Sequence, residues 1–320
     1  MKRHVAPLKP AAPAPSGGGS DIAVTAGRKR GAWLAGSTRF SRRVGSSRTI
    51  LLGGGGLVCI YLLCIVVPLV WASKPEAMGG FPLSPPSLAH PFGTDDLGRD
   101  VMTRAFAAGR IDISVALATV ALSSIIGTLI GCSLVLVRRQ WPDVVVMRLV
   151  DALLAFPYLV ILLLLVTVIG PGRQIGFLPA GLPAIIIAFL FVGWTFYSRL
   201  ARGQALSLRD REYVLAARLA GFSTARILFR HIVPIVFRQV VAYAVLDAIV
   251  TMGALASFSF LGVGVQPPSP EWGNMMFEAQ NYIGTAPWML ISPAVLLAVT
   301  GLSLSAVADG LLARDAFDGR

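Results

Sequence analysis

Residues 50–71 read ILLGGGGLVCIYLLCIVVPLVW and contain no charged side chain. A helix needs about 20 apolar residues to cross the hydrocarbon core of a bilayer, so this stretch is long enough to span it. A cleavable signal has a short basic region and an apolar core of only about 7 to 15 residues, whereas residues 1–49 form a long segment rich in Lys and Arg. We therefore predict a first transmembrane helix over residues 50–72 that stays in the protein.

The rest of the chain repeats this apolar character. Only 14% of the 320 residues are charged and 55% are hydrophobic, with a mean hydropathy of +0.72; soluble domains carry about 25% charged residues. Further apolar runs lie near 113–137, 152–169, 182–198, 235–256 and 288–308. We therefore predict an all-α, polytopic membrane protein with about six transmembrane helices.

The basic residues indicate how these helices are oriented. With the N-terminus inside the cell, 23 of the 28 lysines and arginines fall on the cytoplasmic side, as the positive-inside rule requires. Both termini are then cytoplasmic. The net charge of +12 follows from this topology rather than from nucleic-acid binding, for which a basic patch interleaved with aromatic residues is missing. Residues 1–49 are predicted to be a disordered basic tail.

No chemistry-bearing motif points to an enzyme. A phosphate-binding loop needs glycines followed by Lys and Ser or Thr, and no lysine of this chain stands in that pattern. The motifs HExxH and GxSxG are also absent. We predict that the chain has no catalytic residue, metal or cofactor of its own.

The segment 199–232 is the longest cytoplasmic segment between two predicted spans. Apolar residues recur in it at helical spacing, and this set comprises Leu208, Val214, Leu215 and Leu219. We predict one short helix here that faces the cytoplasm.

Gly221 is expected to end this helix, because a residue just past a helix end often adopts a left-handed conformation. Ser223 or Thr224 then caps a second helix that runs through Arg230, and Pro234 suits the first turn of the fifth span. From these residues alone, docking to a protein and lying on lipid headgroups are equally plausible roles for the helix pair.

Residues 90–100, HPFGTDDLGRD, follow the first span. Thr94 or Asp95 is predicted to cap an amphipathic helix whose apolar stripe contains Leu97, Val101 and Phe106. A brace on the outer membrane surface is favoured over direct contact with substrate.

Two residues inside predicted spans, Asp247 and Pro157, are candidates for a functional role within the membrane. Asp247 lies near the middle of the fifth span, where a charge costs about 2.5 to 3.5 kcal/mol. It either lines a pathway, binding a cation or relaying protons, or bonds to a neighbouring helix or companion subunit. Pro157 can kink the third span, while Asp151 beside Arg148 is predicted to form a charge pair at the membrane boundary.

Four segments resemble the permease subunits of bacterial ATP-binding-cassette (ABC) importers, in the branch that handles dipeptides, oligopeptides and nickel. They are HPFGTDDLGRD (90–100), DALLAFP (151–157), LAARLAG (215–221) ending in IVP (232–234), and ASFSFLG (256–262) followed by QPP (266–268) and EWG (271–273). The resemblance covers residues 88–320 and implies that the protein lies in the inner (plasma) membrane of a bacterium. Leu215 stands where the family has Glu, and Glu212 is one turn earlier.

The resemblance implies the MetI-like fold of type I importers, in which a core over 88–320 carries an outer amphipathic segment, five spans and a coupling loop at 199–232. It implies a heterodimer with a homologous permease, two ATPase subunits that bind ATP and Mg, and an extracytoplasmic binding protein that delivers peptides. The residues assigned to ATPase coupling are Glu212, Leu215, Ala216, Ala217, Arg218, Gly221, Ser223 and Arg226. Asp247 and Pro157 are assigned to the pathway. Nickel or glutathione as cargo is not distinguished from peptide.

The alternative is a secondary transporter or channel that works alone and uses Asp247 for ion coupling.

Overall fold

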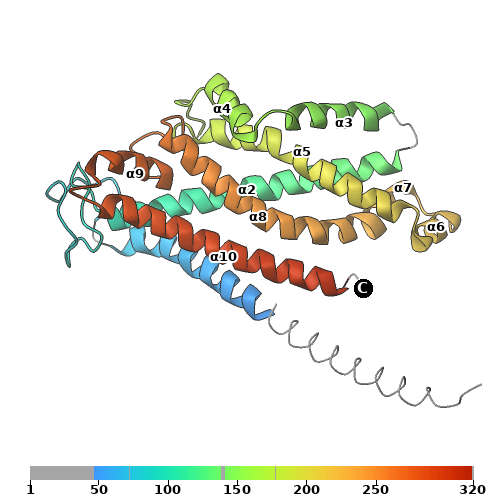
Figure 1. Ribbon diagram of the computed structural model, residues 1–320, viewed down its shortest axis with the longest axis horizontal. Coiled ribbons are helices and arrows are strands. Elements are labelled where there is room, and N and C mark those ends of the chain that lie inside the picture. Colours follow the sequence, from blue (N-terminus) through green and yellow to red (C-terminus); the bar gives the residue numbers. More distant parts are fainter. Residues whose placement is uncertain (1–46, 72, 138–140, 177, 319–320) are drawn as a thin grey trace, which may run out of the picture. The chain divides into compact units, whose positions relative to one another are not determined.

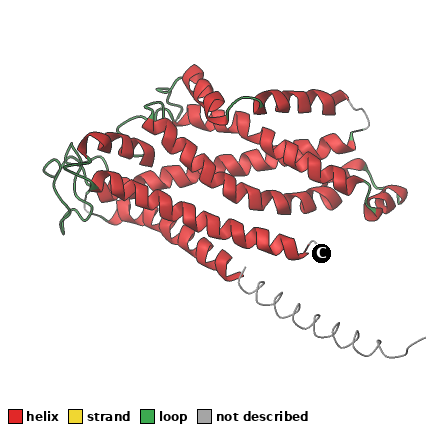
Figure 2. Ribbon diagram, in the orientation of Figure 1, coloured by secondary structure: helices red, strands yellow, loops and turns green. Residues whose placement is uncertain are grey.

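The structure, a computed structural model, describes residues 47–71, 73–137, 141–176 and 178–318. All regular elements in these ranges are helices (Figure 2). The long ones are Ser47–Val70, α2 (Val101–Leu136), α5 (Leu182–Arg209), α8 (Val233–Phe260) and α10 (Trp288–Asp318). The short ones are α3 (Trp141–Leu154), α4 (Tyr158–Ile169), α6 (Glu212–Leu219), α7 (Thr224–Ile227) and α9 (Trp272–Ala279), with a π turn at Leu228–Ile232 and a 3-10 turn at Gln280–Tyr282. The predicted tail lies almost entirely outside the described residues.

Five of the described helices are long and apolar enough to cross a membrane, and there are six spans if α3 and α4 together count as one. The predicted all-α membrane fold with about six spans is confirmed. Two helices extend beyond the predicted apolar runs. α2 starts at Val101 instead of near 113, and α5 continues to Arg209 instead of ending near 198.

The third predicted span, 152–169, is wrong as a single helix. α3 ends at Leu154, α4 begins at Tyr158, and the two are bent by 93°. Pro157 stands directly before α4. It has no backbone N–H to donate, so a continuous helix through this point would lose a hydrogen bond. Proline thus breaks this segment instead of kinking it.

α2 and α5 form the most extensive helix pair. Gly127 and Gly131 of α2 lie against the backbone of α5, where an added Cβ would collide with the carbonyl oxygens of Trp194 and Ser198. Small residues let two helices approach closely in a membrane, where packing replaces the hydrophobic effect as the driving force. α8 packs against both helices, and α10 packs against α8.

The outer motif does not form the predicted separate amphipathic helix. Residues 91–100 make turns, and the cap of α2 is Asp100, whose carboxylate accepts a hydrogen bond from Thr103 N at 2.9 Å. Asp95 instead accepts from Leu97 N and Arg99 N within the turn. Leu97 therefore lies half exposed in a loop, outside the buried stripe of α2.

The polar ends of the bundle are far apart. Figure 1 shows α9 and the loops before α2 at one end of the long helices, with α6 and α7 at the other. The last turn of α10 points toward the same end as α6 (Figure 1).

Candidate functional site

The polar segment 199–232 contains the predicted pair of helices, here α6 and α7. Its first part continues α5 to Arg209, so Leu208 belongs to α5 and not to the predicted short helix. α6 then begins at Glu212, after a break at Asp210 and Arg211.

The turn between α6 and α7 matches the sequence prediction. Gly221 adopts a φ of +80°. Its N–H bonds to Arg218 O at 3.0 Å, and Phe222 N bonds to Ala217 O at 3.1 Å. This is the Schellman arrangement, which satisfies carbonyl groups at a helix end. The turn fixes the angle between α6 and α7.

The second helix starts as predicted but does not end at Arg230. Ser223 caps α7, since its hydroxyl accepts from Arg226 N at 3.3 Å. α7 passes through the π turn directly into α8, so residues Thr224–Phe260 form one helix of 37 residues. Pro234 lies just after the π turn, in the first turn of α8, and because it has no N–H to donate, one backbone hydrogen bond of the long helix is missing at this point.

α6 presents apolar side chains to the outside. Leu219 is 90% exposed, and Leu215 is also exposed, whereas Val214 is fully buried. The residues assigned to coupling are exposed except Ala217, which packs into the chain's own core; the exposed ones are Glu212, Leu215, Ala216, Arg218, Gly221, Ser223 and Arg226. A leucine-bearing helix end of this kind suits a partner protein.

Aromatic and basic side chains brace the turn. The Arg226 guanidinium lies 5.2 Å from the centre of the Phe222 ring, and this ring stacks on His231 of the π turn at 6.1 Å. Cation–π contacts add stability at such partly exposed sites. Beside them lies a cavity of about 580 Å³ whose lining includes Arg209 and Arg218.

Asp247 of α8 bonds to α5 across the bundle. Tyr197 Oη donates to Asp247 Oδ2 at 2.7 Å. The same aspartate lines a cavity of about 450 Å³, whose wall includes the aromatic side chains Tyr158, Phe196 and Tyr243. The bond to a neighbouring helix that was one of the two alternatives is therefore present, and the pathway role of Asp247 stays a prediction.

The predicted boundary pair is wrong in its partner. Asp151 lies 3.3 Å from Arg199 of α5 rather than pairing with Arg148. A tighter contact lies nearby, where Arg202 of α5 donates two hydrogen bonds of 2.6 Å to Asp143 of α3. These contacts tie the broken third segment to α5.

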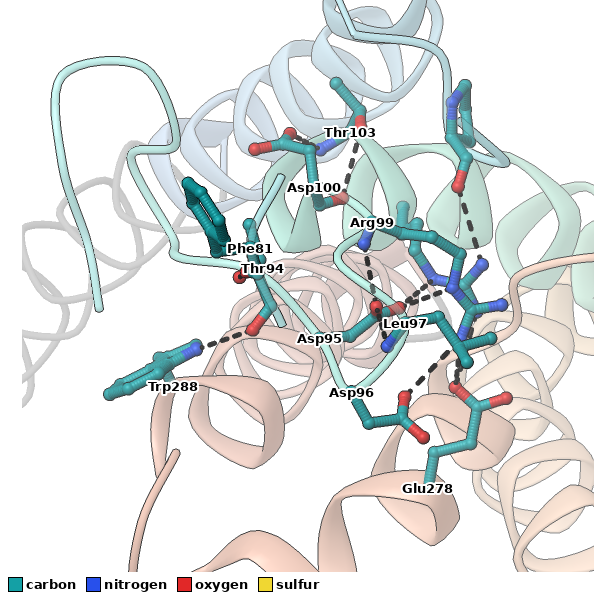
Figure 3. A network of polar contacts seen from close by, with 12 residues as sticks. Phe81, Thr94, Asp95, Asp96, Leu97, Arg99, Asp100, Thr103, Glu278 and Trp288 are labelled. Carbon is teal, nitrogen blue, oxygen red and sulfur yellow. Dashed lines mark hydrogen bonds and ion pairs between the residues drawn. The ribbon is translucent and has the colours of Figure 1, made fainter. Parts of the chain in front are cut away.

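At the opposite end, the outer motif builds a buried ion network (Figure 3). Arg99 Nε donates to Asp95 Oδ2 at 2.6 Å, and its guanidinium also reaches Glu278 of α9 at 3.2 Å. Arg104 contacts the same two carboxylates at 3.4 Å. Burial raises the pKa of Glu278, and the positive charges of Arg104 and Arg99 oppose that rise. The network fastens α9 to the start of α2.

No sequence pattern predicts this network. Asp95 and Arg99 belong to one motif, but no motif or spacing links Arg104 to Glu278. Their separation along the chain is bridged only by the fold, which brings α9 against α2.

Comparison with known proteins identifies the family. Residues 112–314 match the family described as binding-protein-dependent transport system inner membrane component. A provisionally named peptide permease of Brucella suis biovar 1 is 35% identical over 300 residues, covering 92% of this chain and 95% of the relative. The dipeptide transport system permease protein DppC of Alkalihalophilus pseudofirmus is 33% identical, covering 82% and 84%.

A solved structure supports the fold. An inward-facing structure of the MetNI methionine ABC transporter superposes with a TM-score of 0.53 at 17% identity, covering 67% of this chain and 96% of that one. The helical architecture is thus that of MetI-like permeases. The chain belongs to the inner membrane components of binding-protein-dependent transport systems, as a permease subunit of an ABC importer.

Proposed function

We propose that this chain forms half of a pathway for peptides, together with a homologous permease. ATP and Mg bind to two separate ATPase subunits, and an extracytoplasmic binding protein delivers the cargo. The observation that carries the proposal is the α6–α7 pair at the end of the longest helices. Its two helices are joined by the turn at Gly221, and it exposes the apolar side chains of Leu215 and Leu219. The peptide and dipeptide permeases among the relatives support the cargo class.

The orientation of the chain follows from the charges. Most lysines and arginines lie on the side of the N-terminal segment and of α6. We place both termini in the cytoplasm on this basis, where α6 is accessible to an ATPase.

The helix geometry suggests how force is transmitted. α7 continues through the π turn into α8, so a displacement of the α6–α7 pair acts directly on the helix that carries Asp247. Rigid-body switching of packed elements converts small shifts at one end into a change of access elsewhere. The turn at Gly221 holds α6 at a fixed angle to this long helix, Thr224–Phe260.

Reconstitution tests the proposal. The four-subunit complex with its binding protein is expected to accumulate peptide in proteoliposomes only with ATP, and the chain is expected to co-purify with ATPase subunits. The chain alone under an ion gradient is the control. Uphill transport by this chain alone would contradict the proposal and support the secondary transporter.

Asp247→Asn tests the pathway assignment. Asparagine keeps an oxygen that accepts from Tyr197, so the fold is expected to be retained, but the negative charge is lost. Uptake of peptides with a free amino group is expected to fall by about tenfold, the equivalent of about 1.4 kcal/mol. Asp151→Asn, at an exposed ion pair, is the matched control and should transport normally. Wild-type uptake by Asp247→Asn would show that the residue serves only packing.

A further inference from the structure

Two carboxyl groups meet in the interior at the outer end of the bundle, outside every region assigned above. Asp112 of α2 is 2% exposed and Glu271, directly before α9, is 0% exposed. Both accept hydrogen bonds from consecutive backbone N–H groups at the start of α9, Asp112 from Trp272 and Glu271 from Gly273 and Asn274, so the two carboxyl groups lie close together. Two ionised carboxylates offer only acceptors, so a hydrogen bond between them requires a proton on one of them.

Glu271 has the surroundings of an anion. Its carboxylate caps α9, accepting from Gly273 N at 2.9 Å and Asn274 N at 2.8 Å. A helix N-terminus favours negative charge. Burial raises the pKa of Glu271, and these hydrogen bonds oppose the rise. Glu271 is therefore the better of the two sites for the negative charge.

Asp112 has the surroundings of a neutral acid. Its Oδ2 accepts one hydrogen bond, from Trp272 N at 3.1 Å. Its Oδ1 is buried and finds no donor within the described part of the chain. A buried charged oxygen without a partner is costly, whereas a protonated Oδ1 would donate to Glu271.

The neighbouring elements supply no compensating cation. Among the described residues, no basic side chain forms an ion pair with either carboxyl group. α8 offers the Ser259 hydroxyl, α9 offers backbone N–H groups, and the Ser47–Val70 helix brings Cys64 close to Asp112. Because no counter-ion is present, only one of the two carboxyl groups, Asp112 or Glu271, is expected to carry a negative charge.

We propose that Asp112 and Glu271 form a proton-binding site. The proton stays on Asp112, whose carboxylic acid group donates a hydrogen bond to the Glu271 carboxylate. The ligand is a single proton, and the bridge locks the start of α9 to α2. Trp272 reinforces the lock, because its Nε1 donates to Ala105 O at 2.8 Å. α9 in turn holds Glu278 against Arg99 and Arg104, so this proton positions the outer surface of the permease.

Substitution by isosteric amides distinguishes the proton-carrying role of Asp112 from the anionic role of Glu271. The variants are made in the full chain and purified in lipid nanodiscs. Asparagine at 112 can accept from Trp272 and donate to Glu271, so Asp112→Asn should match or exceed the wild-type thermal unfolding midpoint at pH 7. Glutamine at 271 would turn an amide group toward the N–H donors of Gly273 and Asn274. Glu271→Gln is therefore expected to lower the midpoint by at least about 5 °C. Equal damage by both variants would overturn the proposal.

Infrared spectroscopy gives a second readout that does not depend on Glu271→Gln folding. The wild-type chain should show the carbonyl stretching band of a protonated carboxylic acid at neutral pH, well above the pKa of about 4 of exposed acids. Asp112→Asn should lack this band. Absence of the band from wild type, or its persistence in Asp112→Asn, would overturn the proposal.

The pH dependence has a defined sign. Above pH about 4 the unfolded chain has released the proton that the folded pair retains, so wild-type stability should fall relative to Asp112→Asn as pH rises. The difference reaches up to about tenfold in the unfolding equilibrium constant per pH unit while the folded pair keeps its proton. Cys64→Ala should keep the wild-type slope; identical slopes in wild type and Asp112→Asn would contradict the assignment.

Discussion

Gly221→Val is expected to abolish ATP-driven uptake while the chain still inserts into the membrane. Gly221 has a φ of +80°, a conformation that costs a residue with a Cβ about 1 to 2 kcal/mol and is least tolerated by β-branched side chains. No heavy atom outside its own turn lies within 4 Å of the added Cβ, so the effect comes from the backbone and not from a clash. The Schellman turn should open and α6 should lose its fixed angle to α8.

Uptake in proteoliposomes and the amount of inserted protein are the two measurements. Uptake is expected to fall by at least about tenfold, because in the proposed function this turn transmits the displacement of the ATPases. Gly203→Val is the matched control: Gly203 lies exposed in α5, also with open space around its Cβ, but without a positive φ. Normal uptake by Gly221→Val would refute the coupling role of this turn.

Arg104→Met is expected to destabilise the permease by about 3 kcal/mol. Arg104 is 1% exposed and contacts Asp95 and Glu278 at 3.4 Å. Removing one partner of a buried ion network leaves charge uncompensated, which costs about 3 to 5 kcal/mol. Arg99 still contacts both carboxylates, which places the expected loss at the lower end of this range.

Denaturant unfolding in detergent micelles measures this loss, and limited proteolysis reports on the release of α9. Arg110→Met is the control, because Arg110 lies on the same helix but is exposed. Its stability should stay within about 0.5 kcal/mol of wild type. Equal effects of the two variants would show that the buried network contributes nothing specific.

The helical content and the approximate spans could be predicted because each depends on local sequence. Apolar runs longer than a bilayer specify helices, since no other open structure satisfies its backbone inside lipid. The turn at Gly221 and the cap at Ser223 were also predictable, because each is decided within a few residues. Helix ends were less accurate, as the extension of α5 through Leu208 shows.

Predictions failed where a residue's role depends on a distant partner. Thr94 and Asp95 have the chemistry of helix caps, but Asp100 caps α2 while Asp95 binds Arg99 and Arg104. Asp151 was matched to a neighbour in sequence, whereas its partner lies on α5.

The sequence by itself determined that this chain is a bundle of membrane helices, with a polar helix pair bent at a glycine. Hydrophobic length and backbone conformation are properties of short segments, so they can be read without knowing the neighbours. Only the tertiary structure decided that Asp112 meets Glu271 and that Arg104 meets Glu278. The ionisation of a buried acid depends on the groups packed around it, and those groups come from helices far apart in the chain.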